Sequence, residues 1–326
     1  MAPWELGEFA RCLRGPPEPT NASQNDYKMD TWSYRFSGLQ VVSEQPIPEW
    51  SAFRSTQVTN ADVSIAFDCL PDGEPAADEL SPAVSAEEYR FYVPEVGLYR
   101  VRAGREILVR VVREAGKSEV RLFLLGSAWG ALCYQRGLLV VHASAVRVNN
   151  GVVAFCAPPG GGKSSLAAWL SAQGHDLVSD DLCRFEVAKQ GPPLVYPSAP
   201  RLKLWMDALK ALGWDTGKLE RDHFRLNKFH VPVSTRGSLR PLPLRAIYVL
   251  EWGDELRVMP LSGYAALQRF LSAATYHGEL LKAMELLAAY SRHCLRLLQR
   301  VPVWELQRPR DLGTMSETID LLKNRW

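Results

Sequence analysis

The feature that most constrains this chain is a run of three glycines followed by Lys-Ser-Ser, placed directly after an apolar segment. The apolar run Val152–Cys156 is typical of a buried strand, and the residues from Ser164 to about Gln173 follow the pattern of a helix that Gly174 ends. A helix N-terminus offers unpaired backbone N–H groups and partial positive charge, and glycines let a loop curl around an anion. The order of strand, glycine loop and helix therefore predicts a phosphate-binding loop within an α/β fold.

The residues expected to contact a nucleotide are consecutive in this loop: Gly160, Gly161, Gly162, Lys163, Ser164 and Ser165. Lys163 is expected to reach the phosphates, and Ser164 is the expected Mg²⁺ ligand. Ala157 stands where the strict pattern has glycine, and the two prolines after it carry no N–H group. The donors must therefore come from Gly160 onward. The alternative is a flexible glycine turn that binds nothing.

A pair of adjacent aspartates is the second candidate group. Asp180 and Asp181 follow the short apolar strand Leu177–Ser179, which comes after the loop and its helix. Because the carboxyl ends of strands in an α/β sheet face the ligand crevice, we expect this pair to lie beside the phosphates. Carboxylates are needed there to hold a metal and to accept a hydroxyl proton. The alternative is an ordinary turn or helix-cap aspartate.

His142 is the third candidate, because it interrupts an apolar strand, Leu138–Val148. Asn149 and Asn150 suit a tight turn before Gly151, which would pair Val148 with Gly151 and place His142 opposite the start of the glycine loop. A histidine in such a strand needs partners for its ring nitrogens, and a nearby aspartate and phosphate would provide them. A structural, hydrogen-bonded histidine is the alternative.

The rest of the chain predicts an α/β protein with three regions. Residues 1–30 are polar and proline-rich and form an expected lead-in; residues 31–125 form a β-rich domain, expected as an antiparallel meander that includes a strand over 120–124. Residues 126–326 carry the phosphate loop. They begin with a short helix that Ser127 caps and Gly137 ends, and they finish in amphipathic helices over about 265–299 and a short helix after Ser316. The segment 217–245 is expected to be a lid or an exposed basic loop.

Composition excludes several classes of protein. The formal net charge is only +2, which argues against nucleic-acid binding and against an anionic membrane as partner. No stretch approaches the roughly 18 consecutive apolar residues of a membrane span, and the first 30 residues contain no apolar core of a signal peptide. The six cysteines show no metal-binding spacing, so we expect small core residues in a reducing compartment. These features predict a cytoplasmic protein, and they leave a homo-oligomer open.

Three elements at this spacing resemble the catalytic core of HPr kinase/phosphorylase. They are His142-Ala-Ser with the hairpin after it, Gly160-Gly-Gly-Lys-Ser-Ser165, and Gly174-His-Asp-Leu-Val-Ser-Asp-Asp181, within about residues 138–185. The family's Glu-Ile-Arg-Gly-Leu-Gly signature is absent, and Tyr196-Pro-Ser-Ala-Pro-Arg-Leu-Lys-Leu-Trp205 stands in its place. That form is similar to the HPr-kinase-related serine kinases, some of which phosphorylate the C-terminal serine of lasso precursor peptides.

The resemblance implies an HPr-kinase-like P-loop domain that uses ATP and Mg²⁺. It implies that Asp180 is the general base, that Asp181 is a metal ligand together with Ser164, and that His142 positions Asp180, although the two aspartates could exchange roles. The missing signature makes phosphorolysis of phosphoserine doubtful and HPr an unexpected substrate. Arg201 and Lys203 lie where further phosphate or substrate contacts would be useful; solvated strand charges are the alternative.

The expected activity is transfer of the ATP γ-phosphoryl group to a hydroxyl, above all a serine of a peptide or small protein. Two other functions remain open at this point. One is a small-molecule kinase, and the other is a nucleotide-binding regulatory protein that transfers nothing.

Overall fold

The computed structural model describes residues 31–56, 60–70, 75–76, 79–81, 83–217, 219–222, 225–233 and 239–326. The lead-in predicted over residues 1–30 lies outside this part of the chain. So do parts of the segment 71–82 and of the segment 217–245, for which a lid or an exposed basic loop is expected. Within the latter, Arg225–Pro232 is a strand.

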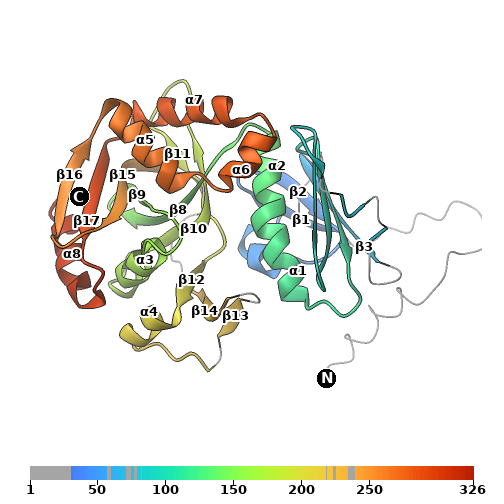
Figure 1. The fold of residues 1–326 in the computed structure, drawn as a ribbon, viewed down its shortest axis with the longest axis horizontal. Helices are drawn as coiled ribbons and strands as arrows, with labels where there is room; N and C mark the ends of the chain where they lie inside the picture. The colour runs from blue at the N-terminus through green and yellow to red at the C-terminus, as the bar shows by residue number, and fades with distance from the viewer. Residues whose placement is uncertain are drawn as a thin grey trace, which may run out of the picture.

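The first half of the chain folds into a seven-stranded sheet of order β1-β2-β3-β7-β6-β5-β4 (Figure 1). Its strands are β1 (Trp32–Phe36), β2 (Leu39–Ser43), β3 (Val63–Cys69), β4 (Ala83–Val84), β5 (Glu88–Val93), β6 (Gly97–Arg102) and β7 (Glu106–Val111). β6 and β7 pair antiparallel on either side of residues 103–105, as the expected meander requires. The simple meander is wrong, because β3 is parallel to both β2 and β7. A 3₁₀ helix, η2 (Pro48–Phe53), lies in the connection between β2 and β3.

One almost continuous helical run follows, made of α1 (Lys117–Phe123), the π-helical turn η3 (Leu124–Ala128) and α2 (Trp129–Gln135). The strand predicted over 120–124, and the helix start predicted at Ser127, are therefore both wrong. Val120, Leu124 and Ala128 are buried at intervals of four residues, which is a helical face; the alternating apolar residues of this stretch imitated a strand. The predicted helix end is confirmed, because Gly137 adopts φ +66° after α2.

The second half contains a mixed seven-stranded sheet of order β11-β10-β8-β9-β15-β17-β16. Its strands are β8 (Leu139–Val148), β9 (Gly151–Cys156), β10 (Leu177–Glu186), β11 (Leu194–Val195), β15 (Leu242–Trp252), β16 (Arg257–Leu261) and β17 (Val303–Arg308). A smaller sheet of order β12-β14-β13 lies beside it, built from β12 (Arg201–Trp205), β13 (Glu220–Asp222) and β14 (Arg225–Pro232). The central strands β9, β15 and β17 are parallel.

Helices cover both faces of the second sheet (Figure 1). α3 (Lys163–Ala172) and α8 (Met315–Lys323), with the short η4 (Leu312–Thr314) before it, lie on one face, and α5 (Gly263–Ala274) and α7 (Leu287–Leu298) lie on the other. α4 (Met206–Ala211) packs against the small sheet, and α6 (Gly278–Ala283) packs against α7. Alternate residues of β9 point to opposite faces. Val153 and Phe155 therefore pack in the core with α3 and α8, whereas Val152 and Ala154 belong to the core with α5 and α7.

The core on the α5 and α7 side continues without interruption into the first sheet. Phe36 stacks on Trp50 with ring centroids 4.3 Å apart, and Trp50 meets Trp129 of α2 edge-on at 5.0 Å. The two halves of the chain therefore share one hydrophobic core across α2.

Four cysteines, Cys133, Cys156, Cys183 and Cys294, are free and buried as expected. Cys69 is disulfide-bonded, which contradicts the expectation at that position. Across the described ranges, every helix is too short or too polar to cross a membrane.

Candidate active site

The glycine loop leads from the end of β9 into α3, and close packing explains its sequence. Gly162 is the N-cap of α3 with φ +80°, and a Cβ built on it would lie 2.1 Å from Arg308 Nη2. A Cβ on Gly161 would lie 2.4 Å from the Cβ of Ala157. Both positions therefore require glycine. Gly162 requires it for its left-handed conformation and for lack of space, and Gly161 requires it for lack of space alone.

Lys163 begins α3 and is only 5% exposed. Its ammonium donates hydrogen bonds to the carbonyl oxygens of Ala157, at 2.8 Å, and of Pro158, at 3.4 Å, so it lies inside the curve of the loop. Burial lowers its pKa, and the charges of Asp180 and Asp181 act in the opposite direction. The cation and the N-terminus of α3 thus face the same loop.

The predicted hairpin is confirmed in register: Val148 pairs with Gly151, and the pairing continues to Ala143 and Cys156. On the other edge of β8, Ser144 and Ala143 pair with Asp180 and Asp181 of β10. The aspartates therefore lie level with the end of β9, where the glycine loop starts.

The strand that carries the aspartates was predicted to end at them. β10 instead continues to Glu186, so the pair sits in mid-strand. Asp181 adopts φ +72°, which is unusual for a residue with a side chain and interrupts the regular alternation of the strand. Both Asp180 and Asp181 consequently line one pocket.

Asp180 is held by three donors from three elements. The hydroxyl of Ser144 donates to Oδ1 at 2.5 Å, the hydroxyl of Ser164 donates to the same oxygen at 3.0 Å, and the backbone N–H of Lys203 donates to Oδ2 at 3.1 Å. Burial raises the pKa of Asp180, and the neighbouring charge of Asp181 adds to the rise. These donors therefore hold the Asp180 carboxylate beside the N-terminus of α3.

Asp181 has different neighbours. The Lys203 ammonium donates to Oδ2 at 2.6 Å, and His142 Nε2 lies 3.5 Å from Oδ1. Burial opposes ionisation of Asp181, but the charge and the hydrogen bond of Lys203, together with the nearby His142 and Lys228, outweigh it and hold the pKa well below its usual value. His142 was expected to position Asp180, and the structure places it beside Asp181 instead.

His142 itself is neutral at pH 7. Burial lowers its pKa to about 4, with the Lys163 charge adding to the effect and Asp181 opposing it. Its ring meets Tyr276 at a centroid distance of 6.2 Å, in the connection between α5 and α6. Tyr276 and the neighbouring His277 were not predicted to approach the site.

The fit of a metal ion depends on Ser164 and Asp180. Their oxygens Oγ and Oδ1 are 3.0 Å apart, which matches the separation of about 3 Å between neighbouring ligands of an octahedral ion with bonds of about 2.1 Å. In the described part of the chain, no three His, Cys, Asp or Glu residues gather as a metal site. One carboxylate and one hydroxyl, completed by phosphate oxygens and water, suit Mg²⁺.

Arg308 packs against the glycine loop from a second side, and it was not predicted from the sequence. Arg308, at the end of β17, is 1% exposed; its guanidinium lies 4.3 Å from the ring centroid of Trp252, and Nη2 is 3.5 Å from the Gly162 carbonyl oxygen. Within the described residues, its Nε and Nη1 atoms have no hydrogen-bond partner. Because β9, β15 and β17 are parallel, their ends meet at this loop. An arginine ending a later strand carries no local motif that would have revealed it.

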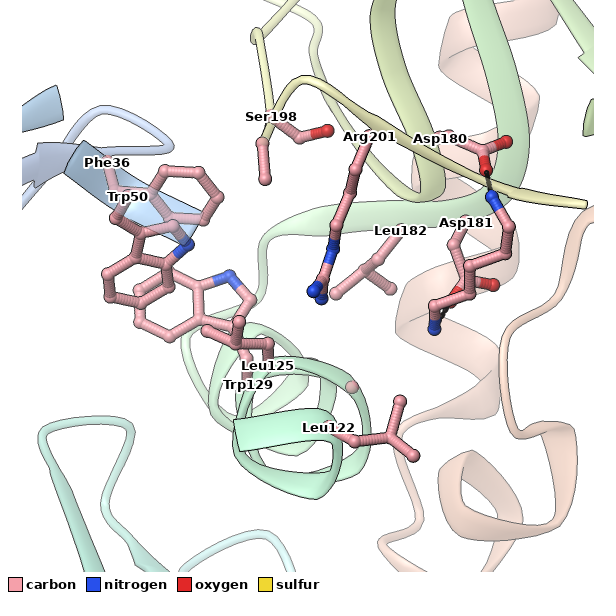
Figure 2. A pocket seen from close by; sticks show the side chains of 13 residues that line it. Phe36, Trp50, Leu122, Leu125, Trp129, Asp180, Asp181, Leu182, Ser198 and Arg201 are labelled. Atoms are coloured by element: carbon pink, nitrogen blue, oxygen red, sulfur yellow. Dashed lines mark hydrogen bonds and ion pairs between the residues drawn. The ribbon is translucent and has the colours of Figure 1, made fainter. Parts of the chain in front are cut away.

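The other two candidates, Arg201 and Lys203, both lie on β12 and line the same pocket as the aspartates. Lys203 joins them directly through its backbone and its ammonium. Arg201 extends between the aspartates and an aromatic cluster of the first sheet and α2 (Figure 2). The structure therefore gathers Lys163, Ser164, the two aspartates, His142 and Lys203 around the N-terminus of α3, whereas Arg201 is linked to them only through the shared pocket.

The fold and the site together define a mixed α/β protein with a glycine-rich loop and a lysine at the end of the central strand β9, and with paired aspartates level with that end in the middle of β10. No family model matches the chain, and no curated protein matches it. A solved structure described as the Hpr(Ser) kinase/phosphatase from Coxiella burnetii is similar to it, with 13% identity over 57% of this chain and 95% of that chain and a TM-score of 0.28. The likeness is distant.

Proposed function

We propose that the protein is an ATP- and Mg²⁺-dependent kinase that transfers the γ-phosphoryl group to a hydroxyl, most specifically a serine of a peptide. The observation that carries this proposal is the grouping of Lys163, Ser164 and the two aspartates at the N-terminus of α3. Cation, helix terminus and glycine loop suit the phosphates, and the carboxylates suit the metal and the acceptor.

The two aspartates take different roles in this proposal. Asp180 contacts the hydroxyl of Ser164, so these two residues would hold Mg²⁺, which shields phosphate charge when bound. Asp181 is ionised beside Lys203 and His142. We therefore assign to Asp181 the role of general base, which accepts the proton of the acceptor hydroxyl. This reverses the assignment implied by the family resemblance.

The residues present can account for each bond and each proton of the proposed transfer. The acceptor oxygen forms a bond to the γ-phosphorus while the bond from that phosphorus to the bridging oxygen breaks, and ADP leaves with the electron pair. The hydroxyl proton passes to Asp181. Lys163 and the N–H groups of the loop bind the charge of the phosphates.

The peptide acceptor rests on the resemblance to HPr-kinase-related serine kinases, including those that modify lasso precursor peptides. The test is incubation with ATP, Mg²⁺ and serine-containing peptides encoded beside the gene, followed by mass spectrometry. We expect a gain of about 80 Da per transferred group, with the charge change of a phosphoserine. Gain on a metabolite alone would establish a small-molecule kinase, and ATP binding without any acceptor would establish a regulatory nucleotide-binding protein.

A further inference from the structure

A small pocket opens beside the aspartates, between the first sheet, α2 and β12 (Figure 2). Its lining includes Phe36, Trp50, Trp129, Asp180, Asp181 and Arg201. The cavity measures about 60 Å³, several times the roughly 10–15 Å³ that one water molecule needs. A small side chain and its backbone therefore have room next to the reactive carboxylates.

The far end of this pocket carries an excess of positive charge. Glu49 of η2 binds Arg121 of α1, with Nε 2.9 Å and 3.0 Å from its two oxygens. The same carboxylate receives only one longer contact from Arg201, at 3.4 Å. Within these three side chains, two guanidinium groups share one carboxylate, so one positive charge is left. Arg201 is the weaker-held of the two arginines and the one that lines the pocket.

The aromatic side of the pocket is closely packed. Phe36, Trp50 and Trp129 pack on one another, and their exposed fractions lie between 1% and 6%. They form a closed wall and offer no open slot for a large ring. The occupant must consequently be slender at this point, and its specificity must come from charge.

The spacing along β12 sets how far the charge lies from the reactive group. Lys203 contacts both aspartates, and Arg201 is two residues earlier on the same side of the strand. Two residues of a strand span about 7 Å. An extended acceptor that puts its hydroxyl at Asp181 therefore brings a group one or two residues away to Arg201.

We propose that this pocket is the acceptor site and that Arg201 binds a carboxylate of the acceptor located within two residues of the hydroxyl that is phosphorylated. The inference rests on the proposed kinase function and narrows its substrate class to small-residue segments with an adjacent carboxylate. The carboxylate belongs either to an acidic side chain or to the C-terminus of the peptide.

Three alanine-based peptides with one serine test this inference by calorimetry in the presence of Mg²⁺ and a non-hydrolysable ATP analogue. The first has aspartate two residues after the serine and an amidated end, the second has asparagine there and an amidated end, and the third ends in a free carboxylate one residue after the serine. We expect the first or the third to bind about ten-fold more tightly than the second, and the better of the two identifies the source of the carboxylate. Arg201→Gln is expected to bring the peptides to within about two-fold of each other. Arg257→Gln, which removes an exposed arginine of β16, is expected to keep the discrimination.

Equal binding of all three peptides, undetectable binding, or unchanged discrimination in Arg201→Gln would overturn the inference. Phosphoryl transfer is measured separately on the same peptides. Transfer to all three with equal efficiency would leave the kinase standing and remove the carboxylate site. Binding that depends on Arg201 without any transfer would keep the site and remove the kinase.

Discussion

At the scale of single residues, the site depends on two adjacent carboxylates with opposite surroundings. Asp180 is bound by neutral donors and has a raised pKa, whereas Asp181 is bound by a lysine and has a lowered one. The left-handed conformation of Asp181 in a strand is a strained arrangement of the kind that functional sites retain. Substitutions of the two aspartates are therefore expected to have different effects on catalysis and on nucleotide binding.

Asp181→Asn should lower kcat by about 10²–10⁴-fold with nearly unchanged ATP affinity, because a general base contacts the nucleotide little. Asp180→Asn should weaken Mg·ATP binding and raise the Mg²⁺ requirement, because it removes charge beside Ser164. Steady-state kinetics with separate nucleotide titrations distinguish these results. A metal phenotype at Asp181 and a pure rate phenotype at Asp180 would restore the reverse assignment.

His142→Ala should resemble a milder Asp181→Asn variant, because the histidine acts through that carboxylate. Combining the two changes should cost much less than the sum of the separate losses in kcat, as expected of residues that act as one unit. Strictly additive losses in a double-mutant cycle would break this link.

His142 also predicts a pH dependence of stability. Its pKa is about 4 in the folded protein against 6.5 for an ordinary histidine, so between these values the unfolded chain binds a proton that the folded chain does not. Stability is therefore lost as the pH falls through this window. The histidine accounts for about 2 kcal/mol of loss between about pH 7 and about pH 5. His142→Gln should flatten the curve of unfolding free energy against pH by that amount in urea titrations. Parallel curves for the two proteins would show that the histidine does not titrate this way.

Lys163→Ala should reduce transfer by at least about 100-fold, which is the usual effect of removing one group that stabilises charge in the transition state. The melting temperature should change little, because the ammonium contacts only two carbonyl groups of the loop itself. Wild-type turnover in a folded Lys163→Ala protein would show that the glycine loop does not bind the transferred phosphates.

The sequence patterns identified the site residues that belong to local motifs. They did not identify the site residues that only the packing of distant segments brings to the site. The glycine loop, the aspartate pair and the register that brings His142 to the loop follow from spacing alone. Ser144 became visible only once β8 and β10 were paired, because a serine in an apolar strand has no signal of its own. The role of Lys203 depends on β12 lying beside β10, and nothing in its neighbours along the chain indicates this.

At the scale of elements, the strands of the second sheet were easier to predict than the helical run from Lys117 to Gln135. Within it, Val120, Leu122 and Leu124 recur at every second position, which is the period of a strand, whereas Val120 and Leu124 also fit the period of a helix. Burial of Val120, Leu124 and Ala128 settles the period, and burial depends on packing between α1, α2 and the two sheets. The parallel pairing of β3 with β2 and β7 could not be predicted either, because it also depends on how distant segments pack.

The ends of β15 and β17 form a further element of the site. Arg308 is buried against Trp252 and Gly162, and two of its nitrogens have no partner among the described residues. Arg308→Met should raise the ATP dissociation constant by about ten-fold or more, since hydrogen bonds of charged groups contribute about 1.5–3 kcal/mol. Its unfolding free energy should be unchanged or higher, because an uncompensated buried charge is removed.

Arg310→Met is the matched control, because Arg310 approaches the same ring at 5.9 Å from an exposed position. It should retain wild-type ATP affinity. Calorimetric titration with ATP and thermal denaturation check both variants. Loss of stability with intact ATP affinity in Arg308→Met would assign the arginine a structural role only.

At the scale of the whole molecule, the first sheet and the second share one core. Sequence patterns marked a boundary near residue 126, which falls inside the π-helical turn η3 and not between separate units. Trp50 lines the pocket and Glu49 contacts Arg201 of its lining, although both lie some 130 residues before the aspartates in the chain. No spacing rule relates positions so far apart, so the part of the first half in the site could not be predicted.

The shared core predicts one cooperative unfolding transition for the whole chain. Scanning calorimetry should give one peak whose van't Hoff and calorimetric enthalpies agree. Trp129→Ala should lower the temperature of that single peak, because removing a buried tryptophan costs about 3–5 kcal/mol. Two peaks, of which Trp129→Ala moves only one, would show that the halves unfold independently.

The turn between β1 and β2 adds a consequence for how such a protein diversifies. Gly38 has φ +71°, and a Cβ on it would lie 2.5 Å from Arg184 Nη1 and 2.7 Å from Tyr196 Cε1. Arg184 is on β10, four residues after Asp180, so this turn abuts the strand that carries the aspartate pair. A lineage cannot exchange its β-rich half by recombination without remaking that contact. If the proposed kinase function holds, new acceptors are therefore expected to arise through substitutions in η2 and at the rim of the pocket, with the pairing of the two halves retained.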